Sequence, residues 1–466
     1  MFKKDFDDKI KELINKYELA QKKGMLPFFE EQDLEQIFLY YFNIFEFEKA
    51  IQVADVGIST FKYSFIFYNH KAETLKELSD YHQALEVLEL AEIFSPNEMS
   101  ILLNKIDVYS LLECYEEAIL LLNEAIDRST GKEKAELYLE LADVYEDAEN
   151  YSAVISSLKS CLEIDNENEE ALNRIWFSVE LTESYEESID FHQKLIDSNP
   201  YNDLAWNNLG HAYKGLKLHE KAIEAFEYVM AIDETYEPAY IDCADIYFHQ
   251  KEYKKAIELY AEVLDITSFQ KDIYYSIGKC YDALENYYLS RDFYREALSL
   301  DPYFANAYFK IGRTYLLTDS PKSALTALKK AYKLDDKNFD FQTALAEAYL
   351  LLGQHDKALK IYDGIIKENE SNKQIHLNLL TILYESGNIN EAIDHINSIE
   401  DKFDDISDLL YIKVAFLYEL DKREEAIVKL YEALAYDSEK SQLLMDLLPI
   451  LIEDQEFMQI IKAYSN

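Results

Sequence analysis

The sequence is poor in glycine and proline, the residues that form turns and end strands. Its 466 residues include only 10 glycines and 7 prolines. That is too few for the many turns of an all-β protein or for Gly-rich linkers. Hydrophobic residues make up 49% and charged residues 29% of the chain, a balance typical of folded domains and not of disordered ones. The composition therefore predicts helices.

Cysteines and long apolar runs are also scarce. The four cysteines, Cys114, Cys161, Cys243 and Cys280, have no CxxC spacing and are too sparse for a disulfide framework. We expect reduced, buried thiols and a cytoplasmic location. The N-terminus is a charged amphipathic segment, and no stretch approaches 18 apolar residues, so neither export nor membrane insertion is expected.

Positive charge is the third shortage. The chain has 46 Lys and Arg against 90 Asp and Glu, a net charge of −44. Such a field repels phosphate backbones and anionic lipid, which argues against nucleic-acid and membrane partners. Residues 101–200 hold 24 acidic and 7 basic side chains, a net charge of −17. A basic partner should bind there; the alternative is that the charge only keeps the chain soluble.

Catalytic motifs are missing as well. The glycines form neither GxGxxG nor GxxxxGK[ST], and the sequence contains no GxSxG and no HExxH. The nine histidines are scattered without metal-ligand spacing. Acidic pairs are so frequent that they are read as solvated helix faces. We therefore predict no catalytic residues, no metal, no cofactor and no enzyme activity.

What the sequence does contain is a repeat of 34 residues. The clearest copy has Trp206, Leu209, Gly210 and Tyr213, followed by Ala222 and Phe226. With Gly210 as position 8, that position is Phe38, Ala72, Ile106, Ala142, Trp176, Gly210, Ala244, Gly278, Gly312, Ala346, Leu380 and Val414. Position 20 is Ala in nine of the twelve units, and position 11 is Tyr in eight.

The apolar positions define two helices in each unit. Positions 4, 7, 8 and 11 form one stripe and positions 20, 24 and 27 form another, as expected for two antiparallel helices. Small residues at 8 and 20 let their axes approach closely. Bulky residues at position 8, Trp176 above all, leave the local spacing open. Ile106 and Ala142 are 36 residues apart, and we expect the two extra residues near 129–132 to lengthen a turn.

These residues resemble the tetratricopeptide repeat family, with its W-x2-L-G-x2-Y, A, F, A, P signature. The resemblance covers about twelve repeats over residues 31–440. It implies an all-α fold, a right-handed superhelical solenoid of antiparallel helix pairs. Residues 1–30, with Phe6, Ile10, Leu13, Ile14 and Tyr17 on one face, are read as an amphipathic N-terminal helix or cap.

Residues 441–466 continue the register as a partial repeat or C-terminal cap, with Pro449 interrupting the helix. This end is rich in Leu and Ile. The alternative to a cap is a contact surface for a second copy of the chain or for a partner.

In this family, positions 2, 5, 9, 12 and 13 of the first helix line a concave groove. The resemblance assigns partner binding to Asn207, His211, Lys214, Ile241, Asp245, Phe248, His249, Tyr275, Lys279, Asp282, Phe309, Arg313 and Leu316. A patch for a basic partner would consist of Glu136, Asp143, Glu146 and Asp147. We further expect Phe248, Tyr275, Lys279, Phe309, Arg313 and Leu316 to converge on one patch.

The function predicted from the sequence is an interaction scaffold, adaptor or assembly chaperone that binds a peptide or helix of another protein in its groove. The alternative is a regulator that responds to a peptide. An enzyme or an RNA-binding helical repeat is disfavoured by the missing motifs and by the charge.

Overall fold

The computed structural model describes residues 2–22, 29–96, 98–368 and 370–464, with side chains of the first helix from residue 10 onward. Phe6 and residues 23–28 of the expected N-terminal cap therefore lie outside the described side chains. All regular elements of the described residues are helices, and no strand occurs among them. The predicted all-α class is confirmed. The chain divides into two compact units, residues 1–239 and 240–466.

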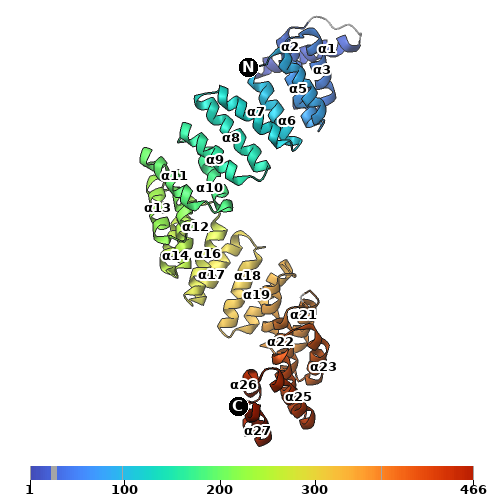
Figure 1. Cartoon of the computed structure of the whole chain (residues 1–466), viewed down its shortest axis with the longest axis vertical. Coiled ribbons are helices and arrows are strands. Elements are labelled where there is room, and N and C mark those ends of the chain that lie inside the picture. Colours follow the sequence, from blue (N-terminus) through green and yellow to red (C-terminus); the bar gives the residue numbers. More distant parts are fainter. Residues whose placement is uncertain (1, 23–28, 97, 369, 465–466) are drawn as a thin grey trace. The chain divides into compact units, whose positions relative to one another are not determined.

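Unit 1 is a single helix followed by six antiparallel helix pairs, coloured blue to green in Figure 1. The helices are α1 (Phe2–Lys22), α2 (Glu31–Asn43), α3 (Phe47–Thr60), α4 (Ile66–Glu77), α5 (Tyr81–Phe94), α6 (Met99–Leu111), α7 (Tyr115–Arg128), α8 (Gly131–Asp147), α9 (Tyr151–Ile164), α10 (Glu169–Thr182), α11 (Tyr185–Ser198), α12 (Asp203–Gly215) and α13 (His219–Ile232). The even-numbered helices from α2 onward are the first helices of the repeats.

Unit 2 continues the pairs and ends in short helices. Its helices are α14 (Glu237–His249), α15 (Tyr253–Val263), α16 (Gln270–Ala283), α17 (Tyr287–Leu300), α18 (Ala305–Leu317), α19 (Pro321–Leu334), α20 (Phe339–Leu350), α21 (His355–Glu368), α22 (Lys373–Glu385), α23 (Ile389–Ile399), η1 (Glu400–Lys402), α24 (Ser407–Glu419), α25 (Arg423–Tyr436), η2 (Ser438–Lys440), α26 (Ser441–Leu447), η3 (Pro449–Glu453) and α27 (Gln455–Tyr464). The unit boundary falls in the first turn of α14.

The backbone conformation also repeats in each of the twelve units. The turn inside each pair has one left-handed residue with positive φ at position 15; these residues are Phe45, Ser79, Glu113, Glu149, Glu183, Lys217, Lys251, Glu285, Asp319, Gly353, Gly387 and Asp421. The next N–H donates to the carbonyl of position 11, as from Asn286 to Tyr281 at 2.9 Å. This is the Schellman ending of a helix.

The helices of each pair cross where position 8 meets position 24. A Cβ on Gly278 would lie 2.5 Å from the Tyr294 ring, and a Cβ on Gly210 would lie 2.6 Å from Phe226. Position 8 of these repeats requires a small residue, because a side chain of the second helix occupies the space beside it. The repeat register predicted this reason. In the first repeat the sizes are exchanged, since Phe38 stands at position 8 and Ala54 at position 24, both fully buried.

The two extra residues between α7 and α8 do not lengthen the turn, so that expectation was wrong. Helix α8 has 17 residues where α6 has 13, and only Ser129 and Thr130 connect it to α7. The segment Lys132–Ala135 consists of good helix formers and extends the helix backward. The insertion therefore shortens the connection.

Both ends of the chain pack onto their neighbouring repeats. In α1, Ile14 and Tyr17 belong to the same buried cluster as Phe38 and Val53. At the other end, α26 stops at Leu447 and a 3-10 turn begins at Pro449. Phe457 of α27 joins the core of the last helix pair.

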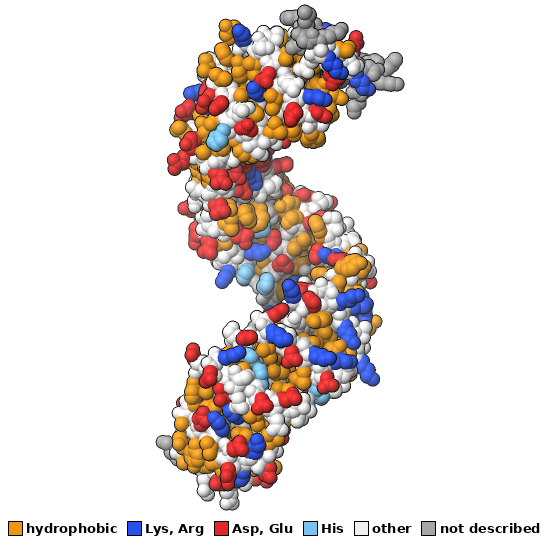
Figure 2. Space-filling view, turned by 90° about the vertical axis from the view of Figure 1, so that its right-hand side faces the viewer, with side chains coloured by type: hydrophobic (Ala, Val, Ile, Leu, Met, Phe, Trp, Pro, Cys, Tyr) orange, Lys and Arg blue, Asp and Glu red, His pale blue; other side chains and the backbone are white. Residues whose placement is uncertain are grey.

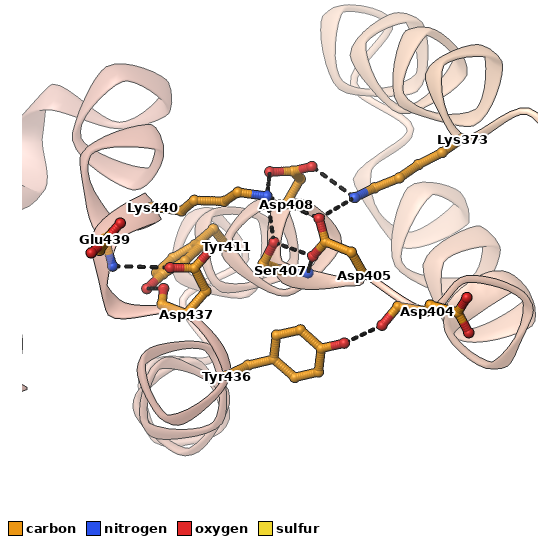
Figure 3. A network of polar contacts seen from close by, with 10 residues as sticks. All are labelled: Lys373, Asp404, Asp405, Ser407, Asp408, Tyr411, Tyr436, Asp437, Glu439 and Lys440. Carbon is orange, nitrogen blue, oxygen red and sulfur yellow. Dashed lines mark hydrogen bonds and ion pairs between the residues drawn. The ribbon is translucent and has the colours of Figure 1, made fainter.

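A network of ion pairs joins the N-terminal ends of α22, α24 and α26, which are the first helices of the last three repeats (Figure 3). Lys373, at the start of α22, lies 2.8 Å from Asp408, and Lys440 lies 3.2 Å from the same carboxylate. Lys440 is also 3.0 Å from Asp405. Hydrogen bonds from Ser407, and then from Lys440, hold the pKa of Asp405 below its usual range. Two cations thus share two carboxylates across three repeats.

None of the described helices is both long enough and apolar enough to cross a membrane. Cys161, Cys243 and Cys280 are buried and Cys114 is half-buried. Burial raises the pKa of Cys161 to about 11 and that of Cys280 to about 12, so these thiols are poor nucleophiles.

Candidate functional site: the first-helix stripe

Positions 5, 9, 12 and 13 of the first helices form what we call the first-helix stripe. Its residues contact those of the next repeat. Lys76 lies 2.7 Å from Asp107, and Arg313 lies 2.6 Å from Glu347. Contacts at this spacing make the stripe continuous over neighbouring repeats within each unit.

A cavity of about 520 Å³ opens on the stripe of unit 1, between α4, α6 and α8. Its lining includes Lys76, Asp107, Ser110, Glu140, Asp143 and Asp147. We call it the acidic cavity. A volume of this size is within the range of ligand-binding pockets. On the face drawn in Figure 2, acidic side chains are spread among hydrophobic ones over unit 1.

Two basic side chains already neutralise part of this surface. Lys76 pairs with Asp107 and also donates to Asn104 at 2.9 Å. The Arg174 guanidinium binds Asp143, and it lies 2.9 Å from Glu146 and 3.2 Å from Glu170. Arg174, from the next repeat, is thus a planar cation held by three carboxylates.

The remaining carboxylates are crowded. Burial raises the pKa of Glu140, and the charges of Asp143 and Asp107 raise it further. Burial also raises the pKa of Asp143, although Arg174 acts in the opposite direction. A raised carboxylate pKa means that the ionised form is disfavoured. A cation entering the cavity would relieve that cost. Ser110 Oγ is also buried, with no hydrogen-bond partner among the described residues.

Each of the four acids predicted from the sequence is partly open to solvent, but they lie in different settings. Asp143 and Asp147 line the acidic cavity, and Glu146 binds Arg174. Glu136 lies outside the cavity and 3.8 Å from Lys132.

Two further carboxylates of the cavity, Asp107 and Glu140, were not predicted from the sequence. Asp107 was identifiable, because it occupies position 9 of the unit that contains Ile106. Glu140 was not, because it occupies position 6, beside the stripe and not on it.

The three residues predicted on α12 are all buried or half-buried. Asn207 is only 5% exposed. His211 stacks on the Trp176 ring at a centroid distance of 5.1 Å, and both His211 and Lys214 are half-buried. Next to Asn207, Asn208 donates to the Leu172 carbonyl at 2.8 Å.

In unit 2, Lys279 lies between two aromatic rings. Its Nζ is 5.3 Å from the centroid of Phe248 and 5.8 Å from that of Tyr275. These three predicted residues are therefore brought together from α14 and α16. Among the other predicted residues of α14, Ile241 and Asp245 are half-buried and His249 is exposed, and Asp245 accepts a hydrogen bond from Tyr260.

Phe309 and Arg313 of α18 turn toward the next repeat instead. Phe309 packs against Phe341 at 5.1 Å, and Arg313 pairs with Glu347. Leu316 is half-buried. Asp282 links the two groups electrostatically: burial raises its pKa, and Lys310 and Arg313 oppose the rise. The six residues expected on one patch thus form two neighbouring clusters.

The described residues hold no group of three or more His, Cys, Asp or Glu placed to bind a metal ion. His376 and His395 do meet, with 2.9 Å between Nδ1 and Nε2, but each is buried or half-buried and hydrogen-bonded to the other.

The chain matches two family models, both described as tetratricopeptide repeat. One covers residues 215–280 and 319–371, and the other covers residues 135–168 and 271–304. No curated protein matches the sequence significantly.

Solved structures with similar repeats include MamA, at 24% identity over 35% of this chain and 95% of that one, with a TM-score of 0.33. YrrB, described as a TPR protein with an unusual peptide-binding site, is 19% identical over 40% and 96%, with a TM-score of 0.34. The APC/C hetero-tetramer Cut9-Hcn1 contributes a chain that is 15% identical over 95% and 94%, with a TM-score of 0.38.

Proposed function

The chain is built of tetratricopeptide repeats, and from that premise we propose that it is a protein-interaction scaffold that holds a basic segment of a partner protein on the first-helix stripe of unit 1. Repeats of this family bind other proteins, so a protein partner is the general expectation. The basic character of the segment is our inference from the acidic cavity.

One observation supports the proposal above all: the acidic cavity brings carboxylates from three first helices together, and the pKa values of two of them, Glu140 and Asp143, are raised. A lysine or arginine of the partner would pair with Glu140 and Asp147, which hold no cation among the described contacts. The way Arg174 is bound beside the cavity supports this arrangement.

Purification of the partner tests the proposal. Affinity purification at low salt, with mass spectrometry, should recover a stoichiometric protein with the wild type and lose it with Glu140→Lys/Asp147→Lys. The matched control is Glu258→Lys/Glu262→Lys, which makes the same charge change at exposed positions of α15. A partner retained by both variants would refute the site.

Salt provides a second test. The affinity for a basic segment should fall as added salt screens the charges, mostly through slower association, because the Debye length is about 8 Å at physiological ionic strength. Binding that does not respond to salt would favour the alternative, that the charge only solubilises the chain. A chain isolated without a partner that compacts when peptide is added would favour the peptide-responsive regulator.

We propose the stripe of unit 2 as a contact for apolar and acidic side chains of the partner. Truncating an interface hot spot typically costs about 2 kcal/mol or more. Phe309→Ala/Arg313→Ala should therefore weaken binding at least about tenfold.

Tyr303→Ala/Lys322→Ala is the matched control, since it removes the same kinds of side chain at exposed positions outside the stripe. Circular dichroism must show that both variants fold. Normal binding by a folded stripe variant would place the contact elsewhere, including the apolar C-terminal segment 441–466.

A further inference from the structure

The junction between α7 and α8 is where the repeat register breaks. Most other repeats are joined by four residues, such as 165–168 between α9 and α10 and 199–202 between α11 and α12, and the remaining connections are longer. Here the connection is reduced to Ser129 and Thr130, because α8 starts early at Gly131.

The two four-residue turns that follow α9 and α11 are joined by hydrogen bonds. Asn166 donates to Ser198 Oγ at 3.2 Å, and Asn202 donates back to the Asn166 carbonyl at 3.1 Å. Asn199 adds a bond of 2.8 Å to Glu167. The α5–α6 turn has no equivalent neighbour. The next connection between repeats, from α7 to α8, has only two residues.

A cavity of about 570 Å³ lies at this place, which we call the junction cavity. Its lining includes the half-buried apolar side chains of Met99, Leu102 and Leu121. It opens at the N-terminal end of α6, whereas the acidic cavity lies along the C-terminal half of the same helix. The two cavities are therefore separate sites.

Polar and charged side chains make up most of the rest of the lining. Glu92 is neutralised by the buried Lys105 at 2.9 Å. Glu124 lies 3.6 Å from Arg128 in a loose pair, with both side chains more than half exposed. Glu98 and Glu133 also line the cavity, and neither is paired with a cation in the described contacts. The surroundings of the cavity are therefore net negative.

We propose that the junction cavity binds one apolar side chain of a partner protein, presented by a segment with lysine or arginine on both sides. Met99, Leu102 and Leu121 would pack against the anchor, and the carboxylates would pair with the flanking cations. A second copy of this chain is a poor occupant, because two chains of net charge −44 repel each other. This site is independent of the acidic cavity.

The probe is a fluorescein-labelled peptide, Lys-Lys-Ser-Phe-Ser-Lys-Lys, measured by anisotropy against the full chain. Replacing its Phe by Ser should weaken binding at least about tenfold, since burying such a side chain is strongly favourable. Met99→Trp, which takes up space beside Leu102 and Leu121 without changing charge, should weaken binding of the Phe peptide to a similar extent and leave that of the Ser peptide unchanged. Equal binding of both peptides to the wild type would overturn the proposal.

Charge reversal tests the surroundings. Glu124→Lys/Glu133→Lys should weaken the Phe peptide at least about fivefold. The matched control, Asp127→Lys/Asp190→Lys, changes the net charge equally at exposed positions that do not line the cavity. The same loss in both variants would show that only the overall charge matters.

Photocrosslinking of the wild type decides the case even where a variant fails to fold. A peptide with benzoylphenylalanine at the anchor should label Met99, Leu102 or Leu121. Labelling around Glu140 and Asp147 would place the peptide in the acidic cavity, which would support the proposed function and reject this second site.

Discussion

Two repeats differ in which helix provides the larger side chain where the two helices of the pair cross. In the α16–α17 repeat, position 8 is Gly278 and position 24 is Tyr294, so the second helix provides the bulk at the crossing. In the α10–α11 repeat, position 8 is Trp176 and position 24 is His192, which is fully buried. The packing constraint therefore applies to the pair of positions and not to position 8 alone. Phe38 at position 8 has the small Ala54 at position 24, whereas Ile106 has Leu122, so a large residue at position 8 does not always have a small partner.

The strongest test of this comparison removes the bulk. Tyr294→Ala should lower the free energy of unfolding by about 3–5 kcal/mol, because it leaves a cavity against Gly278. Adding Gly278→Phe gives this repeat the arrangement of the first repeat, with Phe at position 8 and Ala at position 24. The double variant should regain part of the lost free energy of unfolding. Urea denaturation of both variants measures this; a double variant no more stable than Tyr294→Ala would contradict the pairing.

The second test uses the pH dependence that the α10–α11 repeat alone should have at this position. Burial lowers the pKa of His192 to about 4. Its Nδ1 bonds to the Ser188 carbonyl at 2.8 Å, and its Nε2 has no partner among the described residues. The unfolded chain takes up a proton near pH 6.5 and the folded chain only near pH 4. Stability should therefore fall as pH falls through this window, by roughly 3 kcal/mol in all.

His192→Leu removes the titrating group, and leucine is the residue at position 24 in the repeat with Ile106. Thermal unfolding of both proteins between pH 7 and pH 4 isolates the histidine contribution as a difference. Parallel pH profiles of the two proteins would mean that His192 titrates normally and is not buried as described.

A third test contrasts two helical glycines. Gly278→Ala places a methyl group against Tyr294 and should destabilise the protein by about 1–3 kcal/mol through overpacking. Gly364 of α21 has open space around it, and Gly364→Ala should stabilise by about 0.5–1 kcal/mol, since alanine is the better helix former. Melting temperatures should shift in opposite directions, and a shift in the same direction would mean that the register is misassigned.

The smallest effect concerns the turn of the α16–α17 repeat. Glu285 has a φ of 58°, whereas the equivalent residue in the α20–α21 repeat is Gly353. Glu285→Gly should stabilise the protein by up to about 1 kcal/mol, because a left-handed backbone costs a β-carbon-bearing residue about that much. A loss of stability would indicate that the Glu285 side chain makes an interaction that outweighs the strain.

The repeat register, the helix pairs and the reason for Gly278 were predictable, because each depends on a side-chain type recurring every 34 residues. The α7–α8 junction was not, because an insertion can lengthen either a turn or a helix, and the local helix propensity of Lys132–Ala135 decided the outcome.

The site was only partly predictable for a related reason. Register gives the face on which a side chain starts, which was enough for Asp143 and Asp147. It does not give how far neighbouring side chains reach, and so it could not indicate that Asn207 is buried or that Arg313 pairs with Glu347.

The ion-pair network at the end of unit 2 bears on cooperativity. In a chain of repeats, each repeat contacts mainly its neighbours, so terminal repeats tend to fray one at a time. Asp408 belongs to two interfaces at once, since Lys373 holds it from one side and Lys440 from the other. Opening either interface removes one of the two cations that Asp408 binds, so we expect the last repeats to exchange their amides together. Asp408→Asn would then let α26 and α27 exchange their amides earlier than α22, where the intact chain exchanges them together.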